Sequence, residues 1–100
     1  MTWPRFLALA LCAVPFGAHS EDDVIARSLA ATCANCHGTD GRSASRELPS
    51  LAGMSKEKIA ADLRAFKSGA RPATVMHQLA RGYTDAQIDL VAAYFGARKN

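Results

Sequence analysis

Cys33-Ala34-Asn35-Cys36-His37 is the most specific pattern in this 100-residue chain. Two cysteines three positions apart on one helical turn face the same way, and His37, four positions after Cys33, lies on that face as well. Both sulfurs can therefore bond one edge of a porphyrin while the imidazole binds its iron. The spacing predicts covalent attachment of one c-type haem.

Two other functions use the same cysteine spacing. A thioredoxin-like dithiol is expected beside a strand–helix–strand pattern, and no segment of this chain alternates like a strand. A structural zinc site needs four ligands. Beyond the first 20 residues the soft ligands are Cys33, Cys36, His37 and His77, without the usual histidine pair. The haem interpretation is therefore favoured over both.

The first 20 residues have the pattern of a secretory signal peptide. Arg5 supplies positive charge, Phe6–Phe16 is an almost unbroken apolar run, and Ala18-His19-Ser20 offers small residues at the two positions that a signal peptidase reads. We expect cleavage before Glu21 and a periplasmic location. An uncleaved membrane anchor is the alternative, but this run is short against the ~20 residues that span a bilayer.

Cleavage there gives a removed leader at residues 1–20 and a single domain at residues 21–100. The whole chain has 12 basic and 9 acidic residues, and the leader contains Arg5 and no acid, so the domain has a formal charge of about +2. This near balance gives no indication of nucleic-acid binding. A domain of about 80 residues is close to the lower limit for an unaided core, which a haem would enlarge.

Helical periodicity covers most of the domain and predicts an all-α fold of three to four short helices. Asp22 or Asp23 is expected to cap a first helix that runs into Cys33 and carries the attachment motif. The inner face of this helix is expected to contain Val24, Leu29, Ala30 and Ala31.

Three further helices are expected after the polar loop at residues 39–47. Ser55 should cap one that ends at Gly69, a short one should cover 75–81, and a capping box at Thr84–Gln87 should open the last. The expected inward residues are Ile59, Leu63 and Phe66, followed in the last helix by Ile88, Val91, Ala92 and Phe95. The expected outward residues of the helix after Ser55 are Lys56, Lys58, Asp62 and Arg64.

The face of the iron opposite His37 either binds a ligand or stays open, and the candidates are Met54, Met76 and His77. The chain must pass around the ring before it can reach that face. Met54 follows His37 by only 17 residues, whereas Met76 comes after a complete helix and a turn. Met76 is therefore preferred, with Met54, His77 and an open site as alternatives. A thioether ligand favours ferrous iron and suits electron transfer.

The chain resembles small class I cytochromes c over nearly all of residues 22–96. The shared pattern is an early Cys-x-x-Cys-His-Gly, a proline loop, a late methionine and an aromatic C-terminal helix. A finer similarity links it to the haem subunit of flavocytochrome c sulfide dehydrogenase and to the halves of related dihaem cytochromes. This finer similarity is carried by four segments: Phe66–Gly69, Thr74–Met76, Gly82–Thr84 and Ala93–Phe95.

The resemblance implies a small cytochrome c fold wrapped around one covalently attached haem. It implies thioether bonds at Cys33 and Cys36 and axial ligation by His37 and Met76. It also implies that the carbonyl of Pro49 accepts the ring proton of His37.

The same resemblance implies that Phe95 or Tyr94 crosses the first helix near Ala26 and Ala30. The family often has a glycine or an aromatic residue at this crossing, and neither occurs in Ile25–Ala30. The contacts at the crossing are therefore expected to differ from the family's.

The implied function is electron transfer rather than catalysis, with electrons accepted from the FAD-containing flavoprotein subunit of a sulfide dehydrogenase. A freely diffusing carrier is the alternative, and a haem enzyme with an open iron is a third. Diffusing carriers commonly use strongly one-signed charge to steer encounters. The nearly neutral domain offers little of it.

Overall fold

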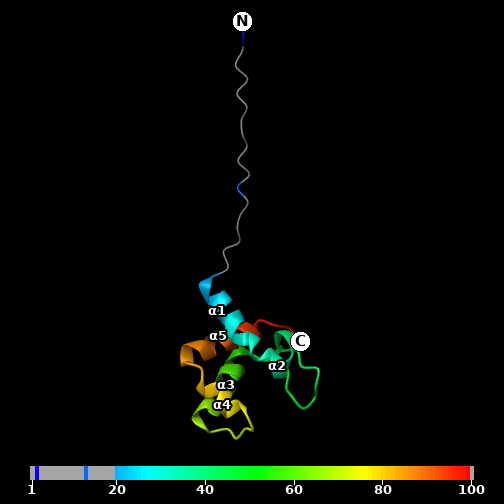
Figure 1. The fold of residues 1–100 in the computed structure, drawn as a ribbon, viewed down its shortest axis with the longest axis vertical. Helices are drawn as coiled ribbons and strands as arrows, with labels where there is room; N and C mark the ends of the chain where they lie inside the picture. Colours follow the sequence, from blue (N-terminus) through cyan, green and yellow to red (C-terminus); the bar gives the residue numbers. More distant parts are fainter. Residues whose placement is uncertain (1, 3–12, 14–19, 100) are drawn as a thin grey trace.

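The computed structural model describes Thr2, Ala13 and residues 20–99, so the predicted leader lies almost wholly outside the described residues. Over residues 20–99 the chain is all-α, as predicted, and contains no strand (Figure 1). Its elements are α1 (Glu21–Ala31), α2 (Ala34–His37), the 3₁₀ turn η1 (Thr39–Gly41), α3 (Lys56–Ser68), α4 (Met76–Arg81) and α5 (Asp85–Gly96). No helix among these residues is long and apolar enough to cross a membrane.

The first helix begins earlier than its acidic residues indicated. Ser20 is the N-cap, and its hydroxyl accepts a hydrogen bond from the backbone N–H of Asp23. Asp22 and Asp23 lie in the first turn, where negative charge is favourable because the helix dipole is positive there. The prediction that one of them caps the helix was therefore wrong. A cut before Glu21 would also remove the observed cap.

The attachment motif lies on a helix of its own rather than on the end of the first one. The N–H of Cys33 bonds to the Ala30 carbonyl at 3.1 Å, three residues back, which tightens the chain between α1 and α2. This break gives five α-helices within residues 20–99, where three to four were expected.

The ends of the later helices follow local capping chemistry, as predicted. The Ser55 hydroxyl caps α3, and Gly69 ends it in the left-handed region at φ 82°. Thr84 and Gln87 form the capping box that opens α5. Polar side chains bound to free backbone groups thus fix where these helices begin.

The apolar core lies where α5 packs against α1 and α3. Ile88 and Phe95 are 0% and 1% exposed, and burial of side chains of this size contributes roughly 1.5–3 kcal/mol each. From α1 the core receives Ala26 and Ala30, two small residues that allow a close approach to α5. Val24, expected on the inner face, is 57% exposed, so that prediction was wrong.

The remaining elements lie beside this core. Figure 1 shows α3 and α4 together at the end of the molecule away from the start of α1, with α2 and the long loop to one side. α4 packs against α3. Space remains between α2, α3 and α4, and the candidate site occupies it.

Candidate haem-binding site

The two cysteines of the motif open onto one cavity. Cys33 is the N-cap residue of α2 and is half-buried, whereas Cys36, inside α2, is exposed. Both line a cavity of about 620 Å³. Burial raises the pKa of the Cys33 thiol.

His37 ends α2 and is only 8% exposed. Its Nδ1 lies 2.7 Å from the carbonyl oxygen of Pro49. Because a carbonyl can only accept, Nδ1 carries the proton, and Nε2 is left with its lone pair. An imidazole held through one ring nitrogen in this way presents the other to a metal in a fixed orientation.

Tight turns bring the proline loop back to this histidine. Gly38 has φ 83°, and a Cβ at this position would collide with the Arg42 carbonyl. The Gly41 carbonyl accepts hydrogen bonds from the N–H groups of Leu51 (2.8 Å) and Ala52 (3.1 Å). These bonds fix the far end of the loop, and with it Pro49, against α2.

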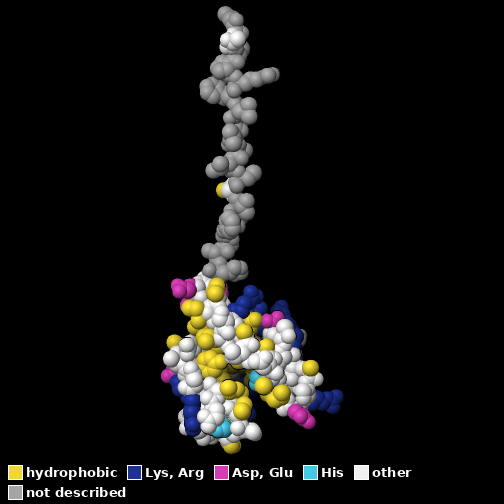
Figure 2. Space-filling view, in the orientation of Figure 1, with side chains coloured by type: hydrophobic (Ala, Val, Ile, Leu, Met, Phe, Trp, Pro, Cys, Tyr) yellow, Lys and Arg dark blue, Asp and Glu magenta, His cyan; other side chains and the backbone are white. Residues whose placement is uncertain are grey.

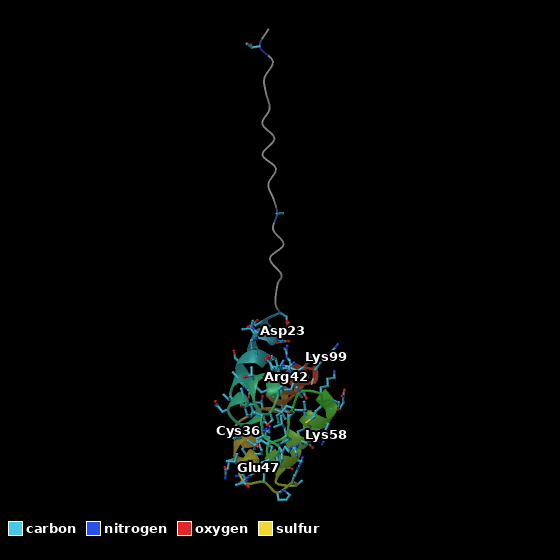
Figure 3. All side chains as sticks on the ribbon, turned by 90° about the vertical axis from the view of Figure 1, so that its right-hand side faces the viewer. Asp23, Cys36, Arg42, Glu47, Lys58 and Lys99 are labelled. Atoms are coloured by element: carbon cyan, nitrogen blue, oxygen red, sulfur yellow. The ribbon has the colours of Figure 1, made fainter. Side chains whose placement is uncertain are left out.

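The cavity is walled mainly by apolar side chains from α3, α4, α5 and the loop at residues 48–54. Its apolar lining includes Leu51, Ile59, Leu63, Phe66, Leu79 and Val91. Figure 2 shows a hollow in this face with hydrophobic side chains along its edges. In Figure 3, Cys36 and Lys58 lie on opposite sides of the view, and both line the cavity, so it extends from α2 to the first turn of α3.

Residues 25–97 match the family model for cytochrome c. The chain belongs to the cytochrome c family. Its cytochrome c domain therefore carries a covalently bound haem c and serves electron transfer. The fold predicted from the sequence is confirmed.

Three relatives illustrate the similarity. The cytochrome subunit of sulfide dehydrogenase from Chlorobaculum tepidum is 50% identical over 72% of this chain and 66% of its own length. Cytochrome c-554(548) from Halomonas halodenitrificans is 34% identical over 68% of this chain and 86% of its own. The thiosulfate dehydrogenase electron acceptor from Thiomonas intermedia is 34% identical over 95% of this chain. This cytochrome spans just under two thirds of the first relative and 44% of the last.

The residues of the cavity fit a haem. Its walls are apolar, two thiols lie at its edge, and a buried imidazole with a free ring nitrogen comes from the same short helix. Haem iron bound in proteins by one histidine commonly takes a thioether as its second axial ligand. A methionine in the cavity wall could supply such a ligand.

Met76 and Met54 both line the cavity, and His77 does not. Met76 is the first residue of α4, whereas Met54 ends the proline loop and packs against the core. His77 is half-buried, and its Nδ1 is buried without a hydrogen-bond partner among the described residues. The structure thus brings Cys33, Cys36, His37 and Met76 around one cavity, with Met54 as a second methionine in its wall.

The sequence did not indicate that charged residues form part of the cavity wall. Lys58 and Asp62 were expected to face outward from α3. Both line the cavity, where Lys58 stays exposed, as expected, and Asp62 is half-buried. Asp62 forms ion pairs with Lys58 at 3.0 Å and with Arg71 at 3.1 Å, and the Arg71 guanidinium lies 4.8 Å from the centre of the Phe66 ring. The i, i+4 spacing of Lys58 and Asp62 was the sequence signal for the first pair.

Tyr83 also lines the cavity, although its position in a turn of the sequence did not indicate this. Its ring lines the cavity and packs against the core cluster. Its hydroxyl lies 3.0 Å from the Thr32 hydroxyl, and its carbonyl accepts a hydrogen bond from Lys67 at 2.6 Å. Tyr83 therefore belongs to the site rather than to the solvent.

The geometry also bears on the two other uses of a Cys-x-x-Cys pair. A reactive dithiol depends on a lowered thiol pKa, and burial raises that of Cys33. Among residues 20–99 no three His, Cys, Asp or Glu side chains come close enough to hold a metal ion. The raised pKa of Cys33 disfavours a dithiol enzyme.

Proposed function

We propose that this cytochrome carries its haem through thioether bonds at Cys33 and Cys36, between the axial ligands His37 and Met76. In the periplasm it accepts electrons from the FAD-containing subunit of a sulfide dehydrogenase. Haem iron supplies the one-electron chemistry by passing between its ferric and ferrous states. The chain supplies attachment, axial ligands and an apolar enclosure.

One observation carries the ligand assignment. The 2.7 Å contact between His37 Nδ1 and the Pro49 carbonyl leaves Nε2 free, and the cavity that His37 lines is also lined by both thiols and by Met76. An apolar enclosure excludes water, and a neutral thioether does not compensate the extra charge of ferric iron. Both features favour the ferrous state and raise the reduction potential.

The need for a flavoprotein partner follows from the number of electrons. The chain contains one Cys-x-x-Cys-His motif and no glycine-rich nucleotide loop, so it can pass one electron at a time. Oxidation of sulfide to elemental sulfur releases two electrons. A flavin can take both together and release them singly to a haem. The relative from Chlorobaculum tepidum is itself named as a cytochrome subunit of sulfide dehydrogenase, which supports this partner.

The balanced charge of the domain supports a lasting contact with the flavoprotein subunit rather than repeated brief encounters. Four of its nine acidic residues form ion pairs within the described residues: Asp40, Asp62, Asp85 and Asp89. Encounters steered over long distances need a field of one sign, which this surface does not offer. A stable subunit contact depends more on apolar area.

A second candidate is a separate carrier that collects electrons from an oxidation of thiosulfate. The relative from Thiomonas intermedia is named an electron acceptor of thiosulfate dehydrogenase, and its similarity extends over 95% of this chain. The relative from Halomonas halodenitrificans, of which 86% is matched, is named as a cytochrome c without reference to a dehydrogenase. In this case the domain would diffuse between donor and acceptor.

Purification from the native host separates the two. The sulfide dehydrogenase assignment predicts that the haem copurifies with a flavin, and that sulfide reduces the haem in the complex but not in the isolated cytochrome. Thiosulfate, added in the same way, is the matched control. A monomer without flavin at every salt concentration, reduced by a thiosulfate-oxidising fraction, would replace the subunit by the free carrier.

A further inference from the structure

We propose that the hydroxyl of Tyr83 is a clasp that positions α4, and with it Met76, against the segment that attaches the haem. Tyr83 acts through α4 and is a positioning residue. The inference rests on the proposed role of Met76 as axial ligand. It adds a contact that fixes this ligand without passing through the iron.

The first step is that Tyr83 is joined firmly to α4. Gly82 is the C-cap residue of α4, and the N–H of Tyr83 bonds to the Ala80 carbonyl at 3.2 Å. Ala80 is 0% exposed. Because the backbone of Tyr83 continues the last turn of α4, a tilt of the helix moves Tyr83 with it.

The second step is the direction of the hydrogen bond to Thr32. The Thr32 hydroxyl donates to the Leu29 carbonyl at 3.1 Å, so its one proton is already used. In the 3.0 Å contact between the two hydroxyls, Tyr83 is therefore the donor and Thr32 the acceptor. Thr32 is the C-cap residue of α1 and directly precedes Cys33. The bond thus joins the end of α4 to the start of the attachment motif.

The third step is that α4 has little else to hold it over the cavity. Of the helices in the described part of the chain, α4 packs closely on α3, and its contacts with the others are marginal. Lys67 of α3 adds to this contact, because its ammonium group donates a hydrogen bond to the Tyr83 carbonyl at 2.6 Å. Among the described residues, the Tyr83–Thr32 contact is the side-chain hydrogen bond that joins the α4–α5 turn to the attachment segment. Without it α4 is free to tilt away on α3.

The predicted consequence concerns the sixth ligand. A loosened α4 lets Met76 leave the iron more often, so an external ligand replaces it faster. One hydrogen bond of this kind changes an opening equilibrium by about fivefold. A weaker thioether bond also favours ferric iron, so the reduction potential falls.

The experiment uses the haem-loaded protein and three variants: Tyr83→Phe, Thr32→Val and the double variant. Tyr83→Phe keeps the ring that lines the cavity and removes the hydroxyl alone. The control is Tyr94→Phe, which removes another tyrosine hydroxyl from a hydrogen bond of similar length, the 2.8 Å bond to Asp40, far from α4 in the sequence. The rate at which imidazole displaces the native ligand from ferric haem is measured for each, together with the reduction potential and the denaturation midpoint.

We expect each single variant to accelerate displacement about fivefold and to lower the potential. The double variant should match the single ones, since both remove the same bond. Tyr94→Phe should lower the denaturation midpoint and leave the displacement rate unchanged. Displacement at the wild-type rate in Tyr83→Phe and Thr32→Val, or equal acceleration in Tyr94→Phe, would overturn the clasp.

A failure of the proposed ligation looks different from a failure of the clasp. If Met76 is not the ligand, Met76→Leu leaves the wild-type ferric spectrum and displacement rate unchanged. If Met76 is the ligand and no clasp exists, Met76→Leu changes both, while Tyr83→Phe changes neither. The two variants therefore decide the two claims separately.

Discussion

The side of the molecule where α1, α3 and α5 meet and the side where α4 faces the cavity are both apolar, but they are closed in different ways. On the first side, Ala92 and Phe95 are 2% and 1% exposed, so the chain covers its own apolar surface. On the second side, Val75 and Leu79 are each 51% exposed although both line the cavity. One half of the core is made by the chain alone, and the other half depends on the haem that the family carries.

The largest effect is expected from removal of both attachment sulfurs. In cells competent in cytochrome c maturation, Cys33→Ala combined with Cys36→Ala should give a chain without covalent haem and without a cooperative thermal transition, because the cavity side then has nothing to pack against. Mass spectrometry and circular dichroism measure the two outcomes. Each single alanine variant, which keeps one sulfur, is the control. A double variant that still has the mass of the haem-loaded protein would contradict the attachment.

A smaller loss is expected from Phe95→Ala, which leaves a hole in the self-closed side. Truncation of a buried phenylalanine typically costs about 3–5 kcal/mol. Chemical denaturation of the haem-loaded protein should show this loss while the ferric spectrum stays as in the wild type. A loss below about 1 kcal/mol would mean that this side does not stabilise the fold by itself.

The sharpest comparison uses two residues of similar exposure. Leu79 is 51% exposed in the cavity wall, and Val24 is 57% exposed on α1, outside it. If haem covers Leu79, Leu79→Ala should lower the stability of the haem-loaded protein by about 1–2 kcal/mol. Val24→Ala should stay within about 0.5 kcal/mol of the wild type, as exposed substitutions usually do. Equal losses of stability in Leu79→Ala and Val24→Ala would show that haem does not cover Leu79.

Much of the fold could be predicted because its signals are local. Ser55, Gly69 and the Thr84–Gln87 box each act on the backbone within a few residues, so the ends of α3 and the start of α5 were predictable. The cap at Ser20 was missed because that residue had been assigned to the leader. Ser20 fits both the end of a leader and the N-cap of a helix, and only the first role had been predicted.

The inner face of α1 was predicted less well for a physical reason. Its buried contacts are made by Ala26 and Ala30, whereas the larger Val24 points to solvent. A helix that approaches another closely buries small residues, which give a weak hydrophobic period. The larger size of Val24 therefore led to the wrong prediction of which face of α1 is buried.

The candidate site also has a part that local sequence predicted and a part that it did not. Cys33, Cys36 and His37 follow from one short motif, because helix geometry alone places them together. Met76 and Tyr83 are distant in sequence from the motif, and the packing of α4 against α3 helps to bring them to the cavity. Sequence spacing could rank Met76 above Met54 but could not place either.

The most direct test of the whole account is the ferric absorption spectrum of Met76→Leu, recorded beside that of Met54→Leu. The central claim is that haem lies in the cavity between His37 and Met76. It predicts that the weak long-wavelength band of a sulfur-to-iron bond is present in the wild type and in Met54→Leu and is lost in Met76→Leu. A band that survives Met76→Leu and disappears in Met54→Leu would contradict it.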